Sequence, residues 1–101
     1  MDYKDVLYRL GYFRNKKNLS ARETSLRIGA SEGHFNRIER GVVELKVETL
    51  LKFLEVVETS PIEFFYPKPE NYANDKELLD IIQTLSTDNK NTLVELAKKL
   101  K

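Results

Sequence analysis

Apolar side chains recur at three- and four-residue steps along most of this 101-residue chain, and no convincing strand pattern interrupts them. Such steps place apolar residues on one face of a helix. The first helix is expected over residues 3–17, with a shared apolar face formed by Val6, Leu7, Leu10 and Phe13. The pattern therefore predicts an all-α fold.

Ser20 marks the start of a second, short helix. Its hydroxyl can accept a free backbone N–H, and Glu23, three residues later, completes a capping box. The helix is expected to run to Ile28 and to stop at Gly29, because glycine tolerates a left-handed backbone.

A third helix is expected over residues 31–40. Ser31 is its candidate N-cap, and Gly41 stands where it should end. Phe35 and Ile38 lie three residues apart, so both point inward from the same face. The second and third helices are thus predicted to be short and to cross steeply through a tight turn.

Two more helices complete the first domain. The fourth is expected over residues 47–58, with a buried side formed by Leu50, Leu51, Leu54 and Val57. Ser60 followed by Pro61 then predicts a capped fifth helix, because the missing N–H of proline costs nothing at the first helical position. This helix contains the further apolar residues Ile62, Phe64 and Phe65.

Pro67 and Pro69 mark a linker. The linker divides the chain into a first domain at residues 1–67 and a C-terminal extension at residues 68–101. The prediction is thus a five-helix domain followed by two further helices.

The extension is expected to form a helical hairpin. Asn74 with Glu77 caps its first helix, and Thr87 starts its second. An apolar stripe on these helices is formed by Leu78, Ile82, Leu85, Leu93, Leu96 and Leu100. The stripe serves either as a homodimer interface or as the contact by which the hairpin folds onto its own core, and the intervening linker favours the dimer.

The distribution of charge suggests a polyanionic partner. The net charge is only +1, but residues 9–46 carry nine basic side chains against four acidic ones, whereas residues 47–101 carry seven against ten. A basic half joined to an acidic half is typical of a polyanion-binding face with a separate packing face.

Residues suited to catalysis or metal binding are scarce. The chain has no cysteine, and its only histidine, His34, is expected on the exposed side of the third helix without a nucleophile motif nearby. The glycines are isolated and the acidic residues lack a metal-ligand spacing. The sequence therefore predicts no enzymatic activity, no cofactor and no metal. The absence of a long apolar run and of a signal-peptide pattern predicts a cytoplasmic protein without a membrane partner.

One run of residues carries a family resemblance. The sequence LSARETSLRIGAS at residues 19–31, followed by Phe35 and by Ile-Glu-Arg-Gly at residues 38–41, resembles the phage-repressor/Cro-like helix-turn-helix family of bacterial and phage transcriptional regulators. Residues 48–52 and 60–65 are similar to the fourth and fifth helices of that family.

The resemblance spans residues 6–65 and implies a five-helix repressor-like DNA-binding domain. Its recognition helix, about residues 31–40, would enter the major groove of double-stranded DNA, which is wide enough to admit a helix. A homodimer would present two such helices to half-sites about 34 Å apart.

The resemblance also implies roles for individual residues. The base-contacting positions are Glu32, Gly33 and Arg37, of which Arg37 is suited to bidentate binding of guanine. Glu32 either accepts from a cytosine amino group or serves the helix dipole alone. The phosphate-contacting positions are Ser20, Arg22, Ser31, Asn36 and Arg40. The simpler alternative for each arginine is a solvated surface charge.

Arg14 and Glu39 fall on positions that form a structural ion pair in the family. We therefore expect Arg14 to hold the fold together and not to contact DNA, since a partly buried arginine needs a partner.

Three departures from the family pattern bear on affinity. Ala21 stands where the family places a phosphate-binding glutamine. Thr24 and Ser25 replace a core leucine and a tightly packed alanine, so the second and third helices are expected to pack less well. The loop at residues 42–45 is apolar and acidic where relatives are often basic. Modest intrinsic affinity that depends on dimerisation is the expectation.

The predicted function is sequence-specific binding of double-stranded DNA for transcriptional regulation, as a homodimer. The alternative is an antitoxin- or adaptor-like protein-interaction module, derived from a helix-turn-helix, that has weak or lost DNA binding and a protein partner on its C-terminal helices. The two differ in salt dependence, because only contacts to several phosphates weaken steeply as salt rises.

Overall fold

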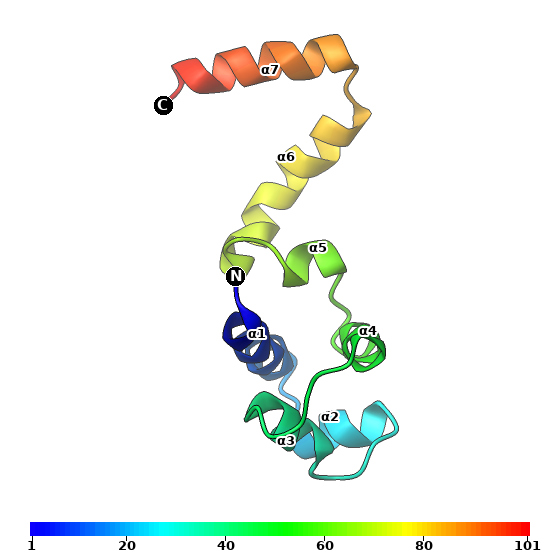
Figure 1. Cartoon of the computed structure of the whole chain (residues 1–101). Helices are drawn as coiled ribbons and strands as arrows, with labels where there is room; N and C mark the ends of the chain where they lie inside the picture. Colours follow the sequence, from blue (N-terminus) through cyan, green and yellow to red (C-terminus); the bar gives the residue numbers. More distant parts are fainter. The chain divides into compact units, whose positions relative to one another are not determined.

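The computed structural model describes residues 1–101 and consists of helices joined by turns, with no strand (Figure 1). The all-α prediction is therefore confirmed. The chain divides into two units, Met1–Tyr66 and Pro67–Lys101. No helix combines the length and the apolar character that crossing a membrane requires.

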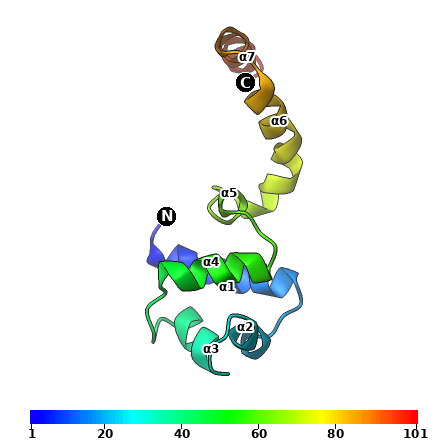
Figure 2. The same cartoon turned by 90° about the vertical axis from the view of Figure 1, so that its right-hand side faces the viewer.

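Five helices form the first unit: α1 (Tyr3–Lys16), α2 (Ala21–Arg27), α3 (His34–Glu39), α4 (Val47–Val56) and α5 (Pro61–Phe64). In Figures 1 and 2, α1 and α4 form a central layer, with α2 and α3 on one side of it and α5 on the other. The two short helices α2 and α3 therefore form one face of this unit.

The helices α1 to α4 all end in the same way. Each is followed by one residue with a positive φ: Asn18 (56°), Gly29 (81°), Gly41 (76°) and Glu58 (52°). The next N–H then bonds to a carbonyl five residues back, as in Ala30 to Ser25 (2.9 Å). This is the Schellman arrangement, which satisfies carbonyls that the helix leaves free. The predicted stops at Gly29 and Gly41 are confirmed, and only glycine takes this conformation without a Cβ penalty.

Three helices of the first unit, α1, α2 and α5, begin with a capping side chain. The capping box of α2 is present, because the Glu23 N–H donates to Ser20 Oγ (3.0 Å) and the Ser20 N–H donates to the Glu23 carboxylate (3.4 Å). Ser60 caps α5 as predicted, with Pro61 in its first turn. Asp2 caps α1, a role that the sequence pattern did not single out, and the N–H bond from Asp5 lowers the pKa of the Asp2 carboxyl.

The core of the first unit is built around aromatic rings. Phe53 of α4 is fully buried, with its ring stacked 5.1 Å from that of Phe35 in α3 and edge-on 6.4 Å from that of Phe64 in α5. The other buried apolar residues are Leu10, Phe13, Leu19, Ile38, Leu54 and Val57. Residues from α1, α3, α4 and α5 thus share one core.

The buried side of α4 differs from the prediction at one position. Leu51 is 54% exposed, and Phe53 occupies the core instead. The physical reason is the helical period: residues 50, 53, 54 and 57 share one face, and residue 51 is rotated about 100° away from residue 50. In α5, only Phe64 is buried, whereas Ile62 and Phe65 are exposed.

The second unit contains a 3₁₀ turn η1 (Pro69–Asn71) and the helices α6 (Tyr72–Thr84) and α7 (Thr87–Lys99). The predicted start of α7 at Thr87 is confirmed, with Ser86 accepting from the Asn89 N–H (3.2 Å). The predicted cap at Asn74 is wrong, because α6 continues directly from η1 and is already helical at Tyr72.

The helices α6 and α7 bury no side chain. Within this unit they do not lie side by side in either view, so the expected hairpin is not formed (Figures 1 and 2). Three residues of the apolar stripe are exposed, Leu78 (54%), Leu96 (53%) and Leu100 (86%), and the other three, Ile82, Leu85 and Leu93, are half-buried.

Candidate nucleic-acid interface

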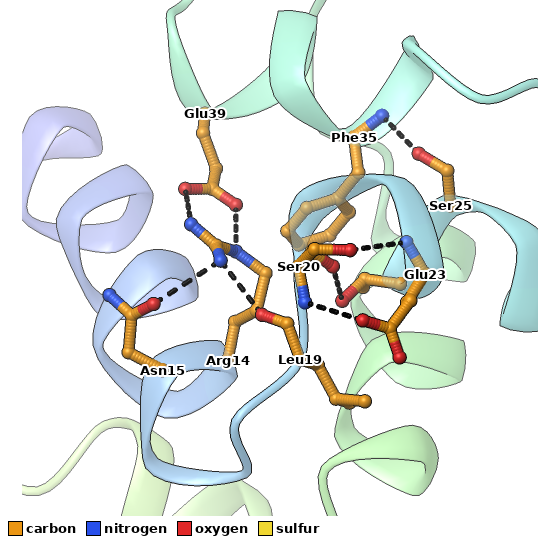
Figure 3. Close-up of polar contacts among 9 residues, drawn as sticks. Arg14, Asn15, Leu19, Ser20, Glu23, Ser25, Phe35 and Glu39 are labelled. Atoms are coloured by element: carbon orange, nitrogen blue, oxygen red, sulfur yellow. Dashed lines mark hydrogen bonds and ion pairs between the residues drawn. The ribbon is translucent and has the colours of Figure 1, made fainter.

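Two buried polar residues lie on α2, and one of them joins this helix to α3. Thr24 and Ser25 have no exposed surface, yet both are hydrogen-bonded. The Thr24 hydroxyl donates to the Ser20 carbonyl (2.9 Å), and Ser25 Oγ accepts from the Phe35 N–H of α3 (2.8 Å; Figure 3). No buried side-chain polar atom lacks a partner. The expectation that these residues loosen the helix pair is thus corrected, because Ser25 adds a hydrogen bond between α2 and α3.

The start of α3 differs from the prediction as well. Ser31 is not the N-cap: α3 begins at His34, and the N-cap is Gly33, which has no side chain to cap with. Residues 31–33 form a turn in which the Ser31 carbonyl accepts the His34 N–H (3.0 Å). A capping side chain normally accepts the N–H of the second or third helical residue. Ser25 does this from α2, since Phe35 is the second residue of α3.

Arg37 lies over the start of α3, beside Gly33. A Cβ added to Gly33 would lie 2.9 Å from Arg37 Nη1, so the glycine makes room for the guanidinium. Arg37 is exposed, and no acidic side chain of the chain pairs with it. The structure thus brings together two of the three residues that the resemblance implies for base contacts.

Glu32 lies in the turn before α3 and pairs with Arg22 of α2 (3.2 Å). Both side chains are 67% exposed, so the pair contributes little to stability. The alternative that Glu32 serves the helix dipole from the first turn is wrong, because the first turn of α3 contains no acidic residue. A predicted base-contacting residue and a predicted phosphate-contacting residue are therefore in direct contact.

The remaining predicted phosphate-contacting residues are Ser20, Ser31, Asn36 and Arg40, and all four are exposed. The Ser20 oxygen is occupied by the capping hydrogen bond as an acceptor, which leaves its O–H available as a donor. Asn36 and Arg40 lie on α3 and at its C-cap, respectively.

Arg14 and Glu39 link α1 to α3 (Figure 3). Arg14 Nε and Nη2 donate to the two carboxylate oxygens of Glu39, at 2.8 and 3.1 Å. Arg14 Nη1 also donates to the Asn15 side chain (3.2 Å) and to the Leu19 carbonyl (2.8 Å). A Cβ at Gly11 would lie 3.1 Å from Glu39 Oε1, so this glycine allows the close approach. All three guanidinium nitrogens are thus engaged within the protein.

Arg9 also has a structural role that the sequence pattern did not reveal. It counts among the basic residues of the first half, but its guanidinium donates to the carbonyls of Phe64 (2.7 Å) and Tyr66 at the end of α5. Free carbonyls at a helix end attract such a cation. His34 is half-buried, not exposed as expected, and no group of residues could hold a metal ion.

Two short helices joined by a tight turn, packed on three further helices, are the architecture of a helix-turn-helix domain. The chain belongs to the helix-turn-helix family of the Cro/C1 type, because residues 10–64 match its family model. It is therefore a DNA-binding helix-turn-helix regulator. No curated protein and no solved structure gave a significant match to the chain.

Proposed function

We propose that this protein binds double-stranded DNA sequence-specifically as a homodimer, with α3 in the major groove, and thereby regulates transcription. The observation that carries the proposal is the position of Arg37. Its guanidinium is exposed over the side-chain-free Gly33 at the start of α3 and has no acidic partner in the chain. A cation held in that way is available to the O6 and N7 atoms of guanine.

The neighbouring turn supplies a second contact to bases. Glu32 accepts a hydrogen bond from the amino group of cytosine after its ion pair with Arg22 has opened. Opening this ion pair costs little free energy because both side chains are solvated. Arg22 then binds a DNA phosphate in place of the Glu32 carboxylate. Gly33 has no side chain, and its part in the base contacts is to make room for the Arg37 guanidinium.

Phosphate contacts position α3 in the groove. They come from Ser20, Arg22, Ser31, Asn36 and Arg40, which lie on α2, in the turn and on α3. These contacts supply affinity without sequence information. The missing glutamine at Ala21 and the acidic loop at residues 42–45 lower that affinity, so a single domain binds weakly.

Dimerisation compensates for the weak single domain. The helices α6 and α7 expose leucine and isoleucine side chains that find no cover within their own unit. Apolar side chains exposed in this number are typical of an association surface. Pairing of two chains through these helices links two recognition helices, so that the second binding event becomes intramolecular.

Selection of bound sequences from random DNA, using the purified full chain, tests the proposal. We expect a palindromic motif for the wild type, and loss of one specified base pair per half-site for Arg37→Ala. Arg37→Ala is expected to cost about 1–3 kcal/mol on the selected operator with little change on random DNA. The matched control is Arg27→Ala, which removes an exposed arginine of α2 outside the proposed contacts.

If Arg37→Ala lowered the affinity for operator and for random DNA equally, Arg37 would not be a base-contacting residue. Failure to enrich any motif, together with affinity that hardly responds to salt, would contradict the proposed function itself.

A further inference from the structure

A cleft of about 930 Å³ lies in the first unit, along α1 and the end of α3. It contains none of the three residues assigned to base contacts. A volume of this size is in the range of protein sites that take small ligands or short segments of another chain.

One wall of the cleft is a regular ridge on α1. Lys4, Tyr8, Tyr12 and Lys16 follow one another at four-residue steps, so they lie above each other on one helix face. Tyr8 is 75% exposed, and its hydroxyl has no partner in the chain. Tyr12 is held in place edge-on to the Phe13 ring, 5.0 Å away. The ridge thus presents two tyrosine rings between two ammonium groups.

Gly11, Leu7 and Tyr3 line the floor and the far end of the cleft. Gly11 lacks a side chain, and the Glu39 carboxylate lies 3.1 Å from the place that a Cβ would take. Leu7 lines the same floor, and Tyr3 is fixed because its hydroxyl accepts the N–H of Leu45 (2.8 Å). A cleft built in advance loses little conformational entropy when it is filled.

The uncompensated charge in the cleft is entirely positive. Its only acidic residue, Glu39, is neutralised by the bidentate bond from Arg14. No acidic side chain forms an ion pair with Lys4 or Arg40, although the charge of Lys4 helps to lower the pKa of the Asp2 carboxyl. Lys16 Nζ lies over the rings of Tyr12 and Phe13, 5.5 and 5.6 Å from their centroids, and 3.9 Å from the Glu63 carboxylate. An occupant with carboxylates at both ends and apolar side chains between them complements this surface.

We propose that the cleft binds an acidic amphipathic peptide segment of a partner protein. Lys4 and Lys16 are twelve residues apart along α1, about 18 Å at 1.5 Å per residue. A partner helix of about three turns spans this length, with its apolar face on the tyrosine rings and its carboxylates on the lysines. Tyrosine is among the side chains that anchor such interfaces. A DNA duplex is convex and polar and does not bury two rings in a concave wall.

Occupation of the cleft regulates the DNA-binding face. Arg40 lines the cleft and is also among the residues assigned to phosphate contacts, so one arginine cannot serve both partners at once. The bound peptide and the operator therefore compete. This second step, unlike the binding of the peptide, rests on the proposed function.

The test uses the full chain and a labelled 14-residue peptide that has leucines at positions i, i+3, i+4 and i+7, glutamates near both ends and alanines elsewhere, with binding measured by fluorescence anisotropy. We expect saturable binding of this peptide, and none of a version with lysine for every glutamate. Tyr8→Ala, at an exposed position, is expected to weaken binding at least tenfold without changing the helical circular dichroism. Lys4→Glu with Lys16→Glu is expected to do the same. The charge-matched control is Lys90→Glu with Lys98→Glu on α7, which should bind as the wild type does.

A second arm measures operator affinity with and without the peptide. With peptide at ten times its Kd, the apparent affinity of the wild type for DNA should fall roughly tenfold. Tyr8→Ala should bind DNA normally and should be insensitive to the peptide.

Three results would overturn the assignment of the cleft: no saturable binding of the acidic peptide, binding unchanged in both cleft variants, or weaker DNA binding by Tyr8→Ala, which would place the cleft in the nucleic-acid interface. Binding of the peptide through Tyr8 by a chain that binds no DNA would support the cleft and contradict both the proposed function and the competition. Operator affinity that does not respond to saturating peptide would contradict the competition alone.

Discussion

The helices α2 and α3 differ from the helices α6 and α7 in the interactions that stabilise them. The first two are 7 and 6 residues long, far below the roughly 12–15 residues at which an isolated helix becomes marginally stable. They exist because Phe35, Ile38, Thr24 and Ser25 are fully or almost fully buried. The helices α6 and α7 are 13 residues each and bury nothing.

This difference shows where each pair obtains its stability. In the first unit, tertiary contacts hold helices that could not form alone. In the second unit, the Ser86 cap and the i,i+4 pair between Lys76 and Asp80 support helices that have no fully buried side chain. Substitutions in the two pairs should therefore have unequal consequences for the unfolding of the first unit.

The largest difference in the free energy of unfolding is expected between a substitution in the core of the first unit and one in the apolar stripe of the second unit. Phe53→Ala should lower the free energy of unfolding by about 3–5 kcal/mol, because it removes a fully buried ring and leaves a cavity beside Phe35 and Phe64. Leu100→Ala, at a side chain that is 86% exposed, should change it by less than about 0.5 kcal/mol. Urea denaturation at low protein concentration measures both. Equal losses would show that the C-terminal leucine contributes to the same core.

Next in size is the bond that attaches α3 to α1. Glu39→Ala leaves the half-buried Arg14 without its carboxylate and should cost about 2 kcal/mol, less than for a fully buried pair because water reaches part of both side chains. A double-mutant cycle with Arg14→Ala, followed by urea denaturation, should give a coupling energy of about 1 kcal/mol or more. Strictly additive effects would show that the bidentate geometry adds nothing.

A smaller loss of stability is expected at the hydrogen bond between α2 and α3. Ser25→Ala leaves the buried Phe35 N–H unsatisfied, which should cost about 1–2 kcal/mol in thermal or urea unfolding. The matched control is Ser86→Ala, which removes a cap from α7 and should leave the unfolding of the first unit unchanged. A stabilising effect of Ser25→Ala would contradict the capping role assigned to this hydroxyl.

The smallest effect on stability, but a specific one on function, is expected at Gly33. Its φ of −91° suits any residue, so Gly33→Ala should unfold like the wild type. The new methyl group would lie 2.9 Å from Arg37 Nη1 and displace the guanidinium. Operator affinity should fall by about 1 kcal/mol, while affinity for random DNA stays the same. Unchanged operator affinity would show that Arg37 does not read bases from this position.

Local signals in the sequence predicted much of the fold. The capping box at Ser20 and Glu23, the stops at Gly29 and Gly41, and the proline after Ser60 are readable because each depends on residues close in sequence. The prediction at Leu51 was wrong, although the helical period of Leu50, Leu54 and Val57 places Phe53, two residues after Leu51, on the same face.

For the candidate site, the family resemblance supplied the proposed residues, and only the structure showed their contacts. The resemblance points to Glu32, Gly33 and Arg37, but not to the pairing of Glu32 with Arg22 or to the room that Gly33 makes for Arg37. Ser31 was misread as a cap because it has the right residue type three residues before His34. The side chain that takes over the capping role, Ser25, lies on a different helix.

The amino-acid sequence by itself determined the helical class, most helix ends and the family, because periodicity, caps and glycine stops act over a few residues. Only the tertiary structure decided that Arg9 is also committed to the fold, because the family resemblance implied such a role for Arg14 alone. Arg9 and Arg14 are engaged by carbonyls and a carboxylate from distant segments, whereas Arg37 and Arg40 are not. Charge alone cannot make this distinction, because an arginine is available to a partner only when no group brought close by folding already binds it.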